Sequence, residues 1–115
     1  MFVVLWEFDV KSECEERFIL AYSPSGAWAR LFATHTKFRE TRLLRHVVEP
    51  LRFATMDMWE SREGYEHFLQ SSANAYRDLD ALCEGLTTRE RHLSSFDADG
   101  DSLVSSFRGD DRVRI

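Results

Sequence analysis

The chain of 115 residues fits one domain, and its 15 basic and 20 acidic residues give a net charge of −5 without a cluster of Lys and Arg. This charge distribution argues against nucleic acid and an anionic membrane surface as partners, because clustered cations recognise both. Cys14 and Cys83 show no metal-site or redox-pair spacing, so we expect free thiols, no metal and a cytoplasmic location. The first residues do not resemble a signal peptide, and no apolar run reaches the length of a membrane span.

The first half of the chain predicts a strand followed by a broken helical region. Residues 2–10 are β-branched and aromatic, and they are too apolar for a strand with one face in water. The segment Ser-Glu-Cys-Glu at 12–15 reads as a capping box, which predicts the start of a helix. The break at 23–26 contains a proline, and Ser23 is the expected cap of a second helical piece that carries Trp28 on its apolar side.

The second half of the chain predicts three more strands around a second helical region. The strands are expected at residues 39–48, 53–60 and 91–97. A short turn containing Pro50 joins the first two as a hairpin. Ser61 is the expected cap of the following helix, in which a break is expected at residues 71–72. Residues 98–115 are polar and are expected to form a loose tail or an arm that docks on a partner.

These elements predict an α+β fold of the order β-α-β-β-α-β, a ferredoxin-like antiparallel sheet in a single domain at residues 1–97. Both helical regions pack on one face of such a sheet. The other face also needs a cover, because the predicted strands are apolar on both sides. A second copy of the chain is the simplest cover, so we expect a homodimer built as a dimeric α/β barrel.

Three segments of the chain resemble the antibiotic biosynthesis monooxygenase family, at residues 22–32, 41–45 and 57–68. The most specific element is Trp59 at a strand end, followed by a serine and then by Tyr65 on the next helix. The resemblance covers residues 1–97 and implies a homodimer with one pocket per chain between sheet and helices. Members of the family oxidise anthrones or hydroquinones with O2 and without metal or flavin. It therefore implies no cofactor and a small aromatic, quinol or polyketide-like substrate.

The resemblance also implies site residues. The Trp and Tyr that the family uses fall on Trp59 and Tyr65, and the family's Asn falls near Thr55, whereas the only Asn of this chain is Asn74. We expect His46, on a predicted strand, to act as a proton acceptor if it faces the pocket. The expected catalytic residues are Trp59, Tyr65 and His46, and the expected substrate-binding residues are Trp6, Trp28, Thr55, Phe68 and Tyr76.

Several functions remain open at this point. The chain could be a cofactor-independent monooxygenase, a non-catalytic barrel that binds a small ligand, or a polyketide cyclase or isomerase, and only the first consumes O2. A heme-degrading branch of the family uses an Asn on the first strand with a Trp and a His on the second helical region. The first strand here has no Asn, and the other two positions fall on Phe68 and Asp78, so heme degradation is not expected. For Trp59, packing in the core is the alternative to a role in catalysis.

Overall fold

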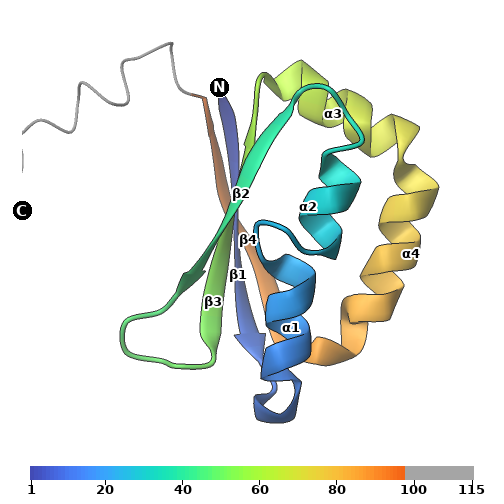
Figure 1. The fold of residues 1–115 in the computed structure, drawn as a ribbon. Coiled ribbons are helices and arrows are strands. Elements are labelled where there is room, and N and C mark those ends of the chain that lie inside the picture. The colour runs from blue at the N-terminus through green and yellow to red at the C-terminus, as the bar shows by residue number, and fades with distance from the viewer. Residues whose placement is uncertain (98–115) are drawn as a thin grey trace, which may run out of the picture.

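The computed structural model describes residues 1–97; residues 98–115, for which a tail or docking arm is expected, lie outside the described residues. The chain forms a four-stranded antiparallel sheet of order β2-β3-β1-β4, with the helices on one of its faces (Figure 1). The strands are β1 (Phe2–Val10), β2 (Phe38–Arg45), β3 (Arg52–Trp59) and β4 (Thr87–Asp97). This arrangement confirms the predicted α+β, ferredoxin-like fold.

Each crossover between strands contains two consecutive helices, as predicted. The helices are α1 (Glu15–Tyr22), α2 (Ala27–Phe32), α3 (Arg62–Ser71) and α4 (Ala73–Cys83), with short 3-10 helices at Ser12–Cys14 and Glu84–Leu86. The expected break at residues 71–72 is confirmed. The expected cap at Ser61 is also confirmed, because its hydroxyl accepts a hydrogen bond from the Gly64 N–H at 3.0 Å.

The two other expected helix caps are wrong. Ser12 lies inside a 3-10 helix, and its hydroxyl donates to Glu13 at 3.4 Å instead of capping α1. Ser23 ends α1, because its N–H donates to the Ile19 carbonyl at 2.9 Å, and α2 starts only after Gly26. The physical reason is that the chain turns back on itself after α1, so that the backbone at Gly26 lies close to the last turn of that helix. A Cβ at Gly26 would lie 2.4 Å from the Leu20 carbonyl oxygen.

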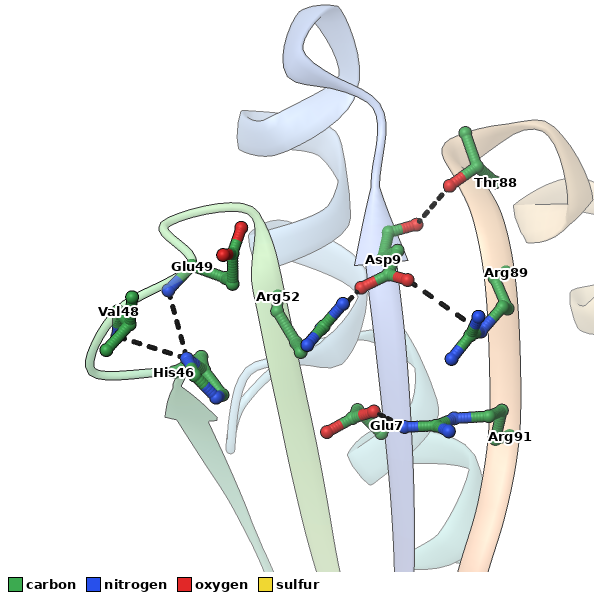
Figure 2. A network of polar contacts seen from close by, with 9 residues as sticks. All are labelled: Glu7, Asp9, His46, Val48, Glu49, Arg52, Thr88, Arg89 and Arg91. Atoms are coloured by element: carbon green, nitrogen blue, oxygen red, sulfur yellow. Dashed lines mark hydrogen bonds and ion pairs between the residues drawn. The ribbon is translucent and has the colours of Figure 1, made fainter.

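Two strands differ in length from the prediction. β2 ends at Arg45, because His46 accepts hydrogen bonds from the backbone N–H groups of Val48 and Glu49 at 3.0 and 2.9 Å and so belongs to the β2–β3 hairpin loop (Figure 2). β4 starts at Thr87, which pairs with Val10, four residues before the predicted start. The start of β4 is not predicted from the sequence, because its Arg-Glu-Arg stretch is charged and does not show the alternation of apolar and polar residues that indicates a strand.

The core lies between the sheet and the helices. Residues of β3 alternate strictly, so that every second side chain, from Phe53 to Trp59, is buried on the helix side. Phe18 of α1 and Phe68 of α3 are fully buried against this face. None of the helices within residues 1–97 has the length and apolar composition that a membrane crossing requires.

Within residues 1–97 no helix covers the opposite face of the sheet, which divides into two parts (Figure 1). At one end Val3 lies between Met58 and Phe96 in register, which makes an apolar patch. At the other end Glu7 pairs with Arg91, and Asp9 lies between two arginines of neighbouring strands (Figure 2). The expectation of strands that are apolar on both sides therefore holds for one end of this uncovered face and fails for the other.

Candidate functional site

A pocket opens between the helix side of the sheet and the helices. The volume of the pocket is about 540 Å³, including the space at its open mouth. The pocket therefore suits a small molecule. Seven aromatic side chains, two threonines and three acidic residues line it: Trp6, Phe8, Tyr22, Trp28, Phe32, Tyr65, Tyr76, Thr41, Thr55, Asp57, Asp80 and Glu90.

Most of the expected substrate-binding residues gather at this pocket, as does one expected catalytic residue. The residues concerned are Trp6, Trp28, Thr55, Tyr65 and Tyr76. They come from β1, α2, β3, α3 and α4, so the pocket depends on the whole fold. A second, wider hollow shares Trp6 and Tyr65 with the pocket and also includes His92, whose ring contacts Trp6 edge to face.

The other expected site residues lie elsewhere. Trp59 and Phe68 are 0% exposed and do not line the pocket. Trp59 contacts the ring of Tyr65 edge to face, with centroids 5.4 Å apart, so it supports a residue that does line the pocket. His46 is exposed in the β2–β3 hairpin loop and does not line the pocket, because the strand on which it was predicted ends one residue earlier. His46 is therefore not placed to accept a proton from a molecule in this pocket.

Asp57 is the buried carboxyl group of the pocket. It occupies a position on β3 that faces the helices and is 8% exposed. The Thr41 hydroxyl donates a hydrogen bond to its Oδ1 atom at 2.7 Å, and Oδ2 accepts none from the residues that the structure describes. Burial raises the pKa of Asp57 to about 6, although the hydrogen bond from Thr41 opposes this change. Near neutral pH the group is mostly a carboxylate and can still take up a proton.

Tyr65 and Tyr76 provide hydroxyl groups beside this carboxylate. Burial raises the pKa of Tyr65, and the negative charge of Asp57 raises it further. The pKa of Tyr76 is also raised, mainly by burial and then by its acidic and tyrosine neighbours. Both phenols therefore remain protonated over the physiological range, in which they can donate hydrogen bonds to an oxygen of a bound molecule.

Two indole N–H groups are buried without a hydrogen-bond partner among residues 1–97, those of Trp28 and Trp59. Trp28 lines the pocket, but its Nε1 atom is itself buried. The Tyr22 hydroxyl and the Cys83 thiol are its polar neighbours, although the geometry of a hydrogen bond is not reached. An indole N–H buried without a partner has a cost in stability.

The pocket lining contains no Lys or Arg. Asp80 and Glu90 are exposed residues at the pocket, and the pKa of Glu90 is raised by burial and then by the charge of Asp80. Within the described part of the chain, no group of three or more His, Cys, Asp or Glu residues is arranged to hold a metal ion. The chemistry available here is thus that of carboxylates, phenols and indoles.

Several pocket residues were not expected from the sequence. They are Phe8, Tyr22, Phe32, Thr41, Asp57, Asp80 and Glu90. The sequence does contain a sign of Asp57, because this carboxylate falls at a buried position of the alternating strand β3. Burial of a carboxylate costs free energy, so such a residue is a candidate for a functional role. Its hydrogen-bond donor is the Thr41 hydroxyl, and none of the ion pairs within residues 1–97 includes Asp57. Glu90 had no such signal, since it stands between two arginines.

Comparison with known proteins shows a shared fold. No family model matches the sequence, and no curated protein matches it. Among solved structures, SnoaB, a cofactor-independent oxygenase from Streptomyces nogalater, is 19% identical, with a TM-score of 0.64 over 86% of this chain and 93% of that chain. A Bordetella bronchiseptica structure whose description suggests an antibiotic biosynthesis monooxygenase is 18% identical, with a TM-score of 0.67 over 85% and 96% of the two chains.

A similarly described structure from Deinococcus radiodurans is 12% identical, with a TM-score of 0.66 over 87% of this chain and 94% of that chain. The matches extend over nearly the whole of each neighbour, so the shared unit is the complete domain. At identities this low the likeness concerns the fold. The fold expected from the family resemblance is thereby confirmed, and the reaction has to be argued from the site.

Proposed function

We propose that this chain, which has the fold of the antibiotic biosynthesis monooxygenases, is a cofactor-independent oxygenase that acts on a small aromatic substrate. The observation that supports it is the placement of a single buried carboxylate, Asp57, in a pocket walled by aromatic rings. Flat, electron-rich rings fit such walls by stacking and edge contacts. A carboxyl group with a pKa of about 6 can accept a proton from a ring carbon or hydroxyl near neutral pH.

The proposed reaction needs only the substrate and O2. Asp57 removes one proton from a ring carbon that bears two hydrogens, as in an anthrone, and the resulting carbanion delivers electrons to O2. A carbon–oxygen bond forms and gives a peroxide. The oxygen–oxygen bond then breaks as the carbon loses its second hydrogen as a proton. The carbon becomes a carbonyl, and the other oxygen atom leaves as water with the two hydrogens.

The remaining residues position the substrate. The hydroxyl groups of Tyr65 and Tyr76 are hydrogen-bond donors, and they stabilise negative charge that develops on a substrate oxygen. Thr41 fixes the Asp57 carboxylate. Trp59, behind Tyr65, orients that ring. In this assignment Asp57 takes the role that the sequence analysis considered for His46.

Oxygen uptake by the purified, metal-stripped protein across a panel of anthrones and hydroquinones tests the proposal. We expect uptake above buffer, and a loss of roughly 10²- to 10⁴-fold in Asp57→Asn because a general base is removed. Tyr65→Phe and Trp59→Phe are expected to lose less. The matched control is Asp78→Asn, which removes the same charge from an exposed position of α4 that does not line the pocket.

Each alternative function predicts a different result. A cyclase or isomerase converts the substrate without consuming oxygen, and a binding module raises the melting temperature with the compound while leaving it chemically unchanged. Absence of uptake across the whole panel would overturn the oxygenase assignment. Full uptake in Asp57→Asn would remove Asp57 from the mechanism.

A further inference from the structure

Acidic residues on the two faces of the sheet differ in how their charge is balanced. On the uncovered face, Glu7 is paired with Arg91, and Asp9 is 2.8 Å from Arg52 and 3.8 Å from Arg89 (Figure 2). These acids are neutralised within the chain. On the pocket side, none of the ion pairs found in residues 1–97 includes Asp57, Asp80 or Glu90, so no described residue neutralises the negative charge of the pocket.

The sequence of β4 shows how this asymmetry arises. Arg89 and Arg91 flank Glu90, and successive residues of a strand point to opposite faces. Both arginines therefore extend over the uncovered face, where they meet Asp9 and Glu7. Of these three residues only Glu90 points toward the pocket. This stretch of β4 therefore places an acidic side chain, and no basic one, in the pocket lining.

The deepest of the three acids is arranged to receive a ligand. Asp57 is more than nine-tenths buried and holds Thr41 through Oδ1, while its Oδ2 accepts no hydrogen bond from the described residues. Asp80 and Glu90 stand at exposed positions of the lining, and Asp57 stands at a buried one. Aromatic side chains line the same pocket, and the face of an aromatic ring attracts a cation.

We propose that the pocket selects aromatic molecules that carry a positively charged amine, with the ammonium group bound by the pocket carboxylates and the ring held between the aromatic walls. Favourable contact between a cation and both carboxylates and ring faces supports this choice. An anionic aromatic acid meets three acids and no basic side chain in the lining, so it is disfavoured.

The proposal deepens the oxygenase assignment and rests on it for the chemical step, but not for binding. When Asp57 takes a proton from a neutral quinol, the negative charge passes from Asp57 to the substrate, in a pocket whose lining also contains Asp80 and Glu90. An ammonium group on the same substrate offsets the charge that the substrate gains. A cationic substrate thus makes the proton transfer compatible with the charges of the pocket.

Three probes with one ring system and the same two-carbon linker test the inference: 2-(2-naphthyl)ethylamine, 2-(2-naphthyl)ethanol and 3-(2-naphthyl)propanoate. Binding is measured anaerobically by titration calorimetry at pH 7.5, so that turnover plays no part. We expect the amine to bind at least about tenfold more tightly than the alcohol, and the carboxylate to bind most weakly. Equal binding of amine and alcohol, tighter binding of the carboxylate, or no binding of the amine would each overturn the inference.

Variants locate the selectivity. Asp57→Asn and, separately, Glu90→Gln are expected to reduce the preference for the amine over the alcohol, while Asp78→Asn, which changes the net charge equally, leaves it intact. Circular dichroism establishes that each variant is folded. A preference that persists in both pocket variants would overturn the inference, as would its loss in Asp78→Asn.

The binding test and the oxygen test fail independently. An amine that binds preferentially but never supports oxygen uptake in any quinol form would leave the selectivity standing and overturn the oxygenase. Oxygen uptake that is equally efficient with neutral and amine-bearing quinols, together with equal binding of both, would leave the oxygenase assignment standing and overturn the selectivity for amines.

Discussion

Thr41 and Asp57 form a buried hydrogen-bonded pair across β2 and β3. The two residues are register partners, each is less than 10% exposed, and the Thr41 hydroxyl lies 2.7 Å from Asp57 Oδ1. The hydrogen bond stabilises the ionised carboxylate, whereas burial favours its protonated form. The balance between these two effects keeps the pKa of Asp57 near 6, within the range where a carboxyl group can act as a base.

The substitution Thr41→Val is expected to raise the pKa of Asp57 above 6, because it removes the hydrogen bond that favours the carboxylate and leaves burial unopposed. The measurement is a ¹³C NMR titration of the Asp57 carboxyl group. Thr55→Val is the control, since Thr55 is a buried threonine of the same pocket that is not among the causes of the shift. An unchanged or lower pKa in Thr41→Val would show that the hydrogen bond has no such effect.

Asp57 is also expected to make the stability of the protein depend on pH. Its pKa is about 6 in the folded chain, whereas the ordinary value of an aspartate, which holds in the unfolded chain, is 3.8. The folded state therefore binds more protons between these pH values, and the free energy of unfolding falls as pH rises through them. At about 1.4 kcal/mol per pH unit, the contribution that is present below pH 3.8 and lost above pH 6 is about 3 kcal/mol.

Asp57→Asn cannot titrate, so its stability relative to the unmodified chain is expected to improve between pH 4 and pH 7.5 by up to that amount. Urea unfolding at both pH values and at one fixed protein concentration measures the difference. A difference between the two proteins that stays constant from pH 4 to pH 7.5 would contradict the expectation.

Gly26 is expected to tolerate no side chain. An added Cβ would meet the carbonyl oxygens of Leu20 and Ala21 at 2.4 and 2.7 Å, and backbone atoms cannot move aside as a flexible side chain could. We expect Gly26→Ala to lower the free energy of unfolding by about 1–3 kcal/mol. Gly85→Ala is the matched control, because nothing lies within 4 Å of its added Cβ, and it is expected to change stability by less than about 1 kcal/mol. Equal losses in urea unfolding would refute the steric argument.

The apolar end of the uncovered sheet face is expected to bind a second copy of the chain, as proposed for a homodimer. Phe96 is 55% exposed on this face, next to Val3. Light scattering at micromolar concentration is expected to give a dimer mass, and Phe96→Glu is expected to shift it toward the monomer, because a charge in an apolar interface has to lose water. Leu82→Glu is the control, as it changes an exposed apolar residue of α4, which lies over the other face. A monomer mass for the unmodified chain would exclude this dimer.

Much of the fold was predictable because its signals are local. The apolar run at β1 and the helical spacing around Trp28 and Phe68 report on residues close in sequence, so the order β-α-β-β-α-β could be predicted without coordinates. A local pattern can also predict wrongly. The capping box predicted at Ser12 does not form, because Ser12 lies in a 3-10 helix that precedes α1. Trp6, Trp28, Thr55, Tyr65 and Tyr76 line one pocket because this topology brings their five elements together.

The sequence by itself determined which segments are strands and helices and that one face of the sheet would hold an aromatic core, because side-chain periodicity follows from the geometry of each element. Only the tertiary structure decided that Thr41 meets Asp57, that Glu90 faces the pocket while Arg89 and Arg91 do not, and that His46 lies in the hairpin loop. These relationships depend on the register between paired strands and on where each strand ends, and a shift of one residue would send every side chain of a strand to the opposite face.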